Sequence, residues 1–326
     1  TKELRELRET WLGRGWYTLA EAVYALGLAI LTARARHAGQ DIDAETAKTA
    51  LWLASFSVSH VLDTSAVDTV IKLLRPLRDQ YLDGWASLLG SAANVEVTDL
   101  VRDELKEIYG HAFNLEDWAK AKLAHAYAKA IDVEKACSLL NDIRDDVLRT
   151  IAGADVYHFL VGTGKSCPNT DPCIELEGVN QRLEKLREET SDPVEFLRNH
   201  PELEEYLRWH STMKPEESLN EVIKETHSFA LFGLGDCAKV KSKLEETERY
   251  FSEAADIARE LGHWENYLIS RRRAISIMVL KGESLDGVVS KFEKLWGEVL
   301  QTMVPTALYS DAAAYVLGGY LVALAL

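Results

Sequence analysis

The stretch of this chain that most resembles a site of chemistry lies between residues 155 and 173. It reads Asp-Val-Tyr-His-Phe-Leu-Val-Gly-Thr-Gly-Lys-Ser and continues with Cys-Pro-Asn-Thr-Asp-Pro-Cys. An apolar segment that runs into Gly-Lys-Ser is typical of a phosphate-binding loop, whose backbone N–H groups hold the phosphates of a nucleotide. The two cysteines, Cys167 and Cys173, bracket a proline-rich turn, and we predict a local disulfide between them.

Two details weaken the nucleotide interpretation. The motif requires a glycine at the position of Phe159 and a helix that begins at Lys165, but Pro-Asn-Thr-Asp-Pro favours turns. The simpler interpretation is the end of a helix, with Gly162 as the left-handed residue after the last turn, and with Gly164 and Lys165 in an exposed linker. We therefore keep a nucleotide-responsive switch built on residues 162–166 as an alternative function.

A second group of residues predicts binding rather than catalysis. Trp118, Lys122, His125 and Lys129 follow one another at spacings of four, three and four, so they form one stripe along a single helix. An aromatic anchor beside basic residues, in a chain of net charge −15, suits an acidic peptide or a C-terminal carboxylate. The stripe is therefore a candidate peptide-binding surface.

The run Ile-Ser-Arg-Arg-Arg-Ala adds three cations, Arg271, Arg272 and Arg273. Arg273 falls on the corresponding face of a later helix, if Val288 marks the helix after it, and so joins the predicted binding surface. The alternative for all these basic residues is that they pair with neighbouring glutamates. That alternative is favoured for Arg271 and Arg272.

Other patterns that indicate catalysis or metal binding are weak. Histidines 158, 200, 210, 227 and 263 include no pair four residues apart, as a metal-binding helix would show. Adjacent acidic residues on a helix do not face each other, and no Gly-x-Ser-x-Gly or cysteine–histidine signature is present. We predict a protein that is not an enzyme and that holds no metal and no cofactor.

The elements that must position these residues are helices. Ala, Leu, Glu, Lys and Arg are abundant, only 7 of the 326 residues are Pro, and apolar residues recur at helical spacing almost throughout. The predicted fold class is all-α. Because the net charge is −15, most of the surface should repel the phosphate backbone of a nucleic acid, and nucleic acid is not an expected partner.

Two apolar stretches, residues 16–31 and 312–326, are shorter than the roughly 20 residues that a membrane-spanning helix needs. The charged first residues do not resemble a signal peptide. We expect a cytoplasmic protein that does not enter membranes. Residues 312–326 predict a helix that pairs with another helix or with a second copy of the chain, and the scarcity of Met, with 3 residues, hints at a thermophile.

Periodicity predicts helices near residues 2–12, 16–37, 44–62, 65–80, 83–93, 98–111, 115–130 and 133–160. A second set is predicted near residues 174–190, 193–198, 201–210, 216–233, 236–261, 264–281, 284–301 and 305–325. Asp43, Thr98 and Asn114 are the expected helix caps, and Pro76 should end or kink its helix near Arg75. Prolines 193, 201, 215 and 305 suit the first turns of helices.

The turn-rich residues 162–173 predict a linker between an N-terminal helical block, residues 1–161, and a C-terminal block, residues 174–326. Successive helices with short connections are typical of arrays of antiparallel helix hairpins.

A repeat can be found within these helices. Ala124 and Tyr127 lie on one predicted helix and Ala136 lies on the next, nine residues after Tyr127. Small residues at such positions let two helices approach closely. Partial matches follow at residues 249–262 and 284–296.

This spacing resembles that of tetratricopeptide repeat (TPR) proteins, although the Trp and Gly that the family has in its first helix are missing from these units. The resemblance implies an α-solenoid in the middle and C-terminal parts of the chain. It also implies that the first helix of each unit lines a concave groove, and thus that the stripe at Trp118 and Lys122 faces a bound peptide.

We therefore expect a non-catalytic scaffold or regulatory adaptor that binds a protein or peptide. The alternatives are the nucleotide-responsive switch at residues 162–166 and the helical sensor region of a longer chain.

Overall fold

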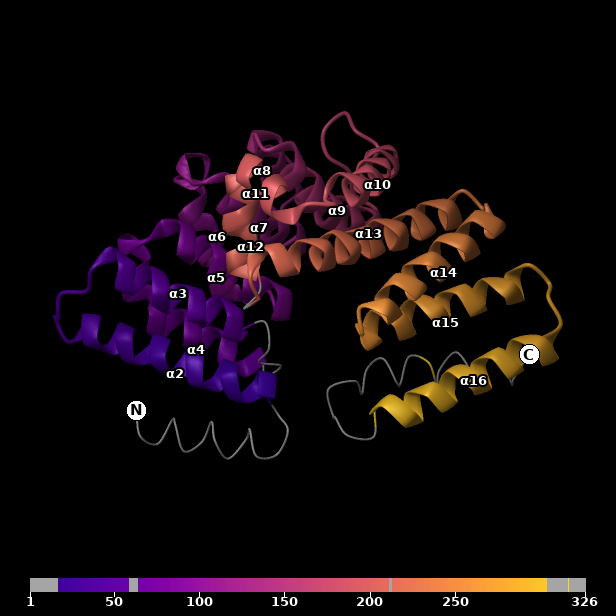
Figure 1. The fold of residues 1–326 in the computed structure, drawn as a ribbon, viewed down its shortest axis with the longest axis horizontal. Coiled ribbons are helices and arrows are strands. Elements are labelled where there is room, and N and C mark those ends of the chain that lie inside the picture. Colours follow the sequence, from indigo (N-terminus) through magenta and orange to yellow (C-terminus); the bar gives the residue numbers. More distant parts are fainter. Residues whose placement is uncertain (1–16, 59–63, 211–212, 304–315, 317–326) are drawn as a thin grey trace. The chain divides into compact units, whose positions relative to one another are not determined.

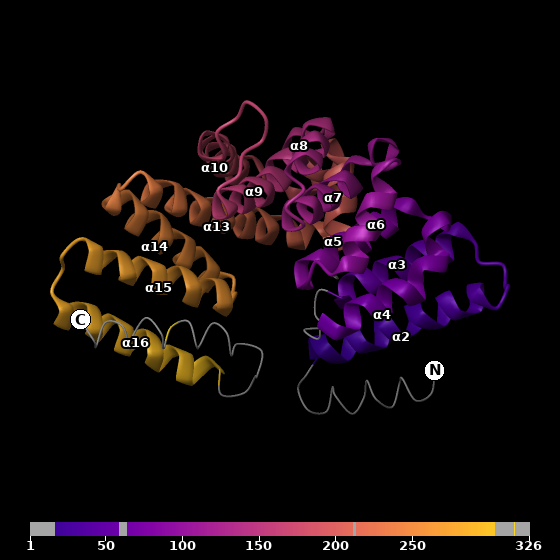
Figure 2. The ribbon, with the colours of Figure 1, turned by 180° about the vertical axis from the view of Figure 1, so that it is seen from behind.

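The computed structural model describes residues 17–58, 64–210, 213–303 and 316. These residues form α-helices, two short 3-10 helices and loops, with no strand among them, so the predicted all-α class is confirmed (Figures 1 and 2). The first elements are α2 (Tyr17–His37), α3 (Ala44–Val58), α4 (Thr64–Leu74), η1 (Arg75–Gln80), α5 (Leu82–Val95), α6 (Asp99–Tyr109), η2 (Ala112–Asn114), α7 (Asp117–Lys129) and α8 (Val133–Asp142). They are followed by α9 (Asp146–Thr163), α10 (Pro172–Glu189), α11 (Pro193–Asn199), α12 (Pro201–His210), α13 (Pro215–Val240), α14 (Leu244–Glu260), α15 (Trp264–Leu280) and α16 (Leu285–Met303).

Packing divides the chain into two units. Unit 1 comprises the described residues up to Ala152 together with Asp192–Ser218, and unit 2 comprises Gly153–Ser191 and the described residues from Leu219 onward. This division differs from the predicted one at residues 162–173. The reason is that α12 lies against α7 and α3 of unit 1 and is buried there through Leu203, Leu207 and Trp209.

In unit 1, α3 contacts α2 and α5, and α7 contacts α5 and α8. The approach of α5 to α7 is close, because a Cβ atom on Gly90 would lie 3.1 Å from the carbonyl oxygen of Lys122. Ala124 on α7 and Ala136 on α8 are both fully buried, as expected of small residues where helices pack. Tyr127 is also buried, and its hydroxyl donates to the carbonyl oxygen of Leu105. These contacts fix the orientation of α7 within unit 1.

In unit 2, α15 contacts both α14 and α16. One apolar cluster joins these helices through residues that include Leu268, Ile275, Phe292 and Leu295. A second cluster is formed by Phe251, Ala274 and Ile277, with Phe232 packed against it.

Several local predictions are confirmed. The side chain of Asp43 accepts from the N–H of Thr46 at 2.7 Å, and that of Thr98 accepts from Val101 at 3.1 Å. Helix α4 ends at Leu74 and is followed by a 3-10 helix that contains Pro76, because proline cannot supply the N–H that an α-helix needs. Prolines 193, 201 and 215 begin α11, α12 and α13, whereas Pro305 lies outside the described residues.

Three predicted boundaries are wrong for identifiable reasons. The helix expected at residues 133–160 is two helices, and the carboxylate of Asp117 accepts the N–H of Arg144 in the break between them. The break expected between residues 233 and 236 lies after Val240, because Gly235 serves close packing: a Cβ there would lie 2.6 Å from the ring of Phe251. Asn114 ends η2 instead of capping α7, whose cap residue is Glu116.

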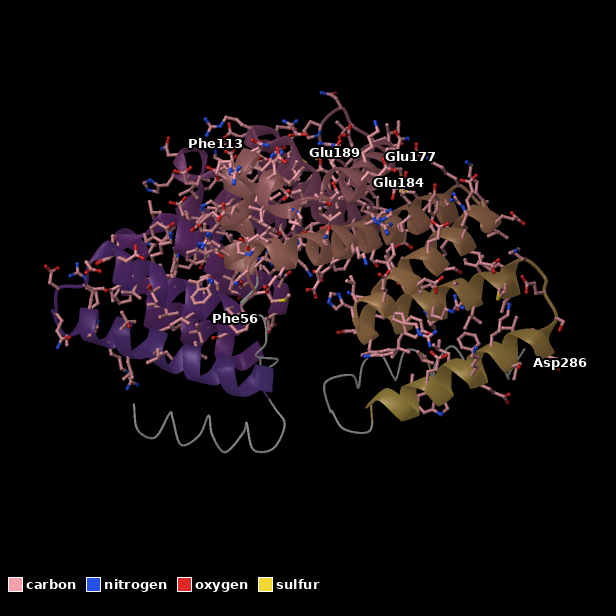
Figure 3. All side chains as sticks on the ribbon, viewed as in Figure 1. Phe56, Phe113, Glu177, Glu184, Glu189 and Asp286 are labelled. Atoms are coloured by element: carbon pink, nitrogen blue, oxygen red, sulfur yellow. A yellow bond between two sulfur atoms is a disulfide. The ribbon has the colours of Figure 1, made fainter. Side chains whose placement is uncertain are left out.

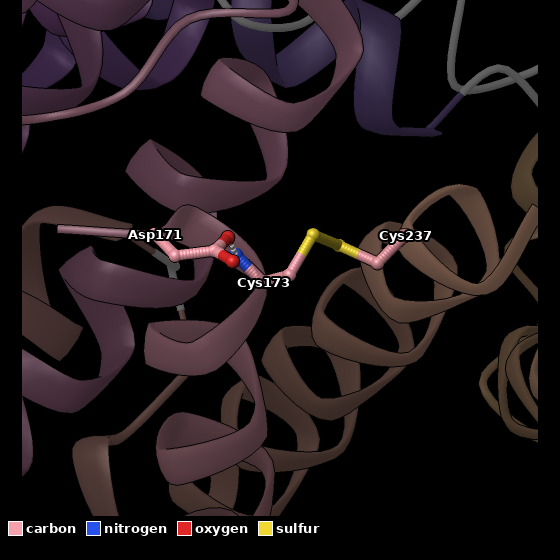
Figure 4. The surroundings of a disulfide bond; sticks show 3 residues. All are labelled: Asp171, Cys173 and Cys237. Carbon is pink, nitrogen blue, oxygen red and sulfur yellow. Dashed lines mark hydrogen bonds between the residues drawn. A yellow bond between two sulfur atoms is a disulfide. The ribbon is translucent and has the colours of Figure 1, made fainter. Parts of the chain in front are cut away.

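The predicted disulfide between Cys167 and Cys173 is also wrong. Cys173 bonds instead to Cys237 of α13, 64 residues away, with a Cα–Cα distance of 5.8 Å (Figure 4). Asp171 caps α10 by accepting the N–H of Cys173 at 2.9 Å, and this places Cys173 in the first turn of α10, beside α13. None of the four cysteines is a free thiol.

Among the described helices, none combines the length and the apolar character needed to cross a membrane. Residues 312–326, which we expected to form a pairing helix, lie outside the described residues apart from Val316. Val316 is buried in the cluster that joins α14, α15 and α16.

The disulfide of Figure 4 should contribute strongly to stability. Cys173→Ala combined with Cys237→Ala should lower the free energy of unfolding by about 4 kcal/mol, because the bond closes a loop of 64 residues and restricts the unfolded chain. Urea unfolding without reductant measures the change. An unaltered midpoint would contradict the assignment, as would a Cys167–Cys173 cross-linked peptide after non-reducing digestion.

A buried histidine on α13 should make unit 2 sensitive to acid. His227 is 5% exposed, and neither of its ring nitrogens has a hydrogen-bond partner among the described residues. Burial, together with the positive charge of Arg187, lowers the pKa of His227 below its ordinary value of 6.5. The unfolded chain therefore takes up this proton at a higher pH than the folded chain.

It follows that the free energy of unfolding should begin to fall as the pH drops below 6.5. The fall should continue until the pH has passed the lower pKa that His227 has in the folded state. His227→Gln should make this decline shallower, because glutamine does not titrate. Urea unfolding at a series of pH values from 7.5 to 5 tests the expectation. The exposed His111, changed to Gln, is the control, and equal slopes for all three proteins would refute the role of His227.

Candidate functional site

The predicted binding stripe lies on α7, but α12 covers its first half. Trp118 is only 2% exposed, and its ring stacks on that of Trp209 with 4.8 Å between the ring centres. The backbone N–H of Trp118 donates to Glu202 of α12 at 3.2 Å. The expectation that Trp118 anchors a partner in an open groove is therefore contradicted, because the chain's own helix occupies that position.

The remaining residues of the stripe are half-buried. The ammonium group of Lys122 lies 4.3 Å from the centre of the Tyr206 ring and 3.2 Å from Nδ1 of His210, both on α12. His125 is hydrogen-bonded to the side chain of Asn94, and Lys129 lies in the last turn of α7. In unit 1 the stripe thus holds helices together.

Arg273, the fifth predicted residue, belongs to unit 2 and is engaged there. Its guanidinium donates to both carboxylate oxygens of Asp236, at 2.6 and 2.8 Å. It also lies over the ring of Phe232, 4.4 Å from the ring centre. Arg273 is therefore paired, but not with a neighbouring glutamate as the alternative had it, because its partner is an aspartate 37 residues away.

The Gly-Thr-Gly-Lys-Ser segment ends a helix. Gly164, with φ of +66°, is the left-handed residue, while Gly162 still lies within α9, so the predicted cap was misplaced by two residues. The N–H of Lys165 donates to the carbonyl oxygen of Leu160 at 2.9 Å, and that of Gly164 donates to Val161 at 3.1 Å. The next helix begins only at Pro172. The segment therefore presents the carbonyl end of a helix to solvent, and that end repels phosphate.

His200 meets Asp145 and Asp146 in unit 1, with possible metal-binding atoms within 4.8 Å of one another. This group could not be found from residue spacing, because His200 lies 55 residues from Asp145. Asp145 is already engaged, since one carboxylate oxygen bonds Nδ1 of His200 at 2.9 Å and the other accepts the N–H of Leu148 at 2.9 Å. Asp145 thus caps α9. Its bond to His200, the residue that precedes α12, links α12 to α9.

The most distinctive site in unit 2 is a cavity of about 370 Å³ lined by α14, α15 and α16, which we call the basic cavity. Its apolar floor includes Ala274, Ile275 and Leu295. Its charged lining consists of four cations and two carboxylates, namely Arg259, Arg271, Lys291, Lys294, Glu248 and Glu298. Elsewhere in unit 2 the exposed surface carries acidic side chains, such as Glu177, Glu184 and Glu189 of α10 (Figure 3).

Both carboxylates of the basic cavity have partners. Glu248 accepts from the ammonium group of Lys281 at 2.7 Å. Glu298 accepts from the hydroxyl of Tyr267, which also lines the cavity. Burial, and then this hydrogen bond, raise the pKa of Tyr267 to about 12, so the phenol stays protonated and continues to donate to Glu298.

Three of the cations have no anionic partner among the described residues. The side chains of Arg271 and Lys294 take part in no hydrogen bond and no ion pair there, and the side chain of Arg259 makes only a ring contact, 5.6 Å from the centre of the Tyr267 ring. Arg271 is half-buried, so its guanidinium has lost part of its water without gaining a carboxylate. The pairing with glutamate that we expected for Arg271 is not observed.

The sequence held one signal for the basic cavity, the arginine run at residues 271–273. Which of its members is paired and which is open depends on the helices packed around α15. Arg273 meets α13, whereas Arg271 lines the cavity formed with α14 and α16.

No protein-family model and no curated protein matches this chain. The resemblance to TPR proteins therefore still rests on the residues quoted for it.

Trp118→Ala should destabilise unit 1 by about 3–5 kcal/mol, because a buried indole is removed and its stacking partner Trp209 is left beside a void. Urea unfolding followed by circular dichroism measures the loss. Lys122→Ala is the control on the same face of α7, and it should cost less than about 1 kcal/mol because Lys122 is only half-buried. A stable Trp118→Ala protein would contradict the packing described here.

Proposed function

We propose that this protein is a non-catalytic scaffold or regulatory adaptor whose basic cavity binds an acidic segment of a partner protein. The observation that carries the proposal is a set of cations, Arg259, Arg271 and Lys294, that line a cavity and have no anionic partner among the described residues, in a chain of net charge −15. A local cluster of cations on a protein that is negative overall attracts anions to that cluster. A carboxylate there would supply Arg271 with the partner that it lacks.

The size of the cavity suits a short peptide segment better than a whole protein surface. A volume of about 370 Å³ falls within the range of roughly 300–1,000 Å³ that ligand sites occupy, and holds two or three side chains. The floor of Ala274, Ile275 and Leu295 offers apolar contact between the cations. The expected ligand is thus a segment with acidic side chains, or a C-terminal carboxylate, next to an apolar residue.

The resemblance to TPR proteins supports this proposal in a general way. We propose that α13 to α16 form antiparallel helix hairpins stacked as in an α-solenoid, an architecture that commonly presents surfaces for peptides. The binding surface differs from the one expected at Trp118, because α12 occupies that position. We retain the proposal of a protein or peptide partner and move its site to unit 2.

We further propose a cytoplasmic location in a thermophile. Cys173 and Cys237 are bonded and none of the four cysteines is a free thiol. Disulfides inside cells are typical of hyperthermophiles, whereas in mesophiles they indicate an oxidising compartment. A melting temperature above about 90 °C would agree with a hyperthermophile, and one near 50 °C would favour an oxidising compartment of a mesophile.

Charge reversal in the basic cavity should abolish capture of an acidic peptide. Arg271→Glu with Lys294→Glu should weaken binding of a fluorescein-labelled Asp/Glu-rich octapeptide by about 10- to 100-fold, because two attractive charges become repulsive. Fluorescence anisotropy at 50 mM salt measures the affinity. The control, Lys239→Glu with Lys241→Glu, makes the same change of charge at exposed positions of unit 2 and should alter the affinity less than threefold.

The neutral variant Arg271→Gln with Lys294→Gln guards against misfolding caused by charge reversal and should show an intermediate loss. Comparison of a free with an amidated C-terminus distinguishes recognition of a terminal carboxylate from recognition of acidic side chains. Equal binding to all variants, or binding of a Lys-rich octapeptide as tight as that of the acidic one, would overturn the proposal.

A further inference from the structure

A second cavity of unit 2 lies on another side of α15. It has a volume of about 160 Å³ and is lined by residues of α9, α13 and α15. We call it the aromatic cavity. The α15 residues that line it, Asn266, Ile269 and Ser270, are different from those that line the basic cavity, so the two sites are separate.

Aromatic rings form much of the wall. The ring of His158 is edge-on to that of Phe232, with 5.4 Å between the ring centres, and lies 6.1 Å from that of Phe229. All three residues line the cavity. A cavity of about 150 Å³ with apolar walls is large enough to hold one benzene ring. A single aromatic ring therefore fits this volume, and it would find ring edges and faces with which to pack.

The α15 wall carries two polar side chains, those of Asn266 and Ser270. Within the described part of the chain, neither side chain takes part in a hydrogen bond, although Ser270 is only 2% exposed. Other serines nearby are satisfied: Ser228 donates to the carbonyl oxygen of Ala254 at 2.9 Å, and Ser276 donates to that of Arg272 at 3.0 Å. A ligand in the cavity that bonds to these two side chains would gain a hydrogen bond from each.

We propose that the aromatic cavity binds a phenolic ring, that is, one six-membered aromatic ring with a hydroxyl group. The ring packs against Phe229, Phe232 and His158, and the hydroxyl bonds to Asn266 or Ser270. A purely apolar ring of the same size would leave those two polar groups unsatisfied. The phenol can belong to a small molecule or to a tyrosine side chain, because the two share this chemistry.

Titration calorimetry with p-cresol and with toluene tests the proposal. We expect p-cresol to bind at least about tenfold more tightly than toluene, because only p-cresol offers a hydroxyl to the polar wall. N-acetyltyrosinamide distinguishes the sources: competition with p-cresol identifies a tyrosine side chain as an acceptable ligand, and lack of competition restricts the site to small phenols. Failure of p-cresol to bind, or equal affinity for toluene, would overturn the proposal.

Two variants of α15 locate the binding. Ser270→Ala and Asn266→Leu should each reduce the preference for p-cresol over toluene by about threefold or more. Ser276→Ala is the matched control on the same helix, because its hydroxyl is already bonded to backbone, and it should keep the full preference. Ser270→Ala suits a helix, so its melting temperature should remain close to that of the parent protein. If Ser276→Ala and Ser270→Ala lose the preference equally, the assignment of the ligand to this cavity is wrong.

This inference does not depend on the acidic-peptide site. Loss of peptide binding in the basic-cavity variants and loss of phenol selectivity in the aromatic-cavity variants are separate outcomes, each with its own probe.

Discussion

The stacking of Trp118 on Trp209 decides which surfaces of this protein are available to a partner. It holds α12 on α7, so the stripe of aromatic and basic residues that would otherwise suit a peptide is used inside unit 1. The contact is large and buried, and the hydrogen bond from Trp118 to Glu202 fixes its register. Because α12 covers this part of α7, we expect a partner to bind instead where charges or polar groups have no partner among the described residues.

The helix α15 provides two such surfaces because it packs with other helices on several sides. Its residues Leu268 and Ile275 join the apolar cluster of unit 2, while Tyr267 and Arg271 line the basic cavity. Asn266 and Ser270 line the aromatic cavity. An amphipathic helix normally has one buried and one solvated face. In α15, Tyr267, Arg271, Asn266 and Ser270 line cavities instead, where a polar side chain without a partner among the described residues favours a ligand that pairs with it.

Sequence reasoning could predict whatever depends on neighbours along the chain. The all-α class, the caps at Asp43 and Thr98 and the helix break at Pro76 follow from local rules, and all are observed. The failures involve contacts between distant residues. The partner of Cys173 is 64 residues away and Trp118 bonds to a residue 84 positions on, so neither could be found from helical periodicity. Arg271 and Arg273 have similar neighbours in sequence. Only helix packing decides that Arg273 pairs with Asp236 while Arg271 lines the basic cavity.

We propose that unit 2 receives an acidic partner through its basic cavity. Hydrogen–deuterium exchange of the full chain, with and without a saturating Asp/Glu-rich octapeptide, tests it most directly, because it locates binding without any substitution. We expect slower exchange in the segments of α14, α15 and α16 around Arg259, Arg271 and Lys294. Slower exchange confined to α7 and α12, or no change in any helix, would contradict it.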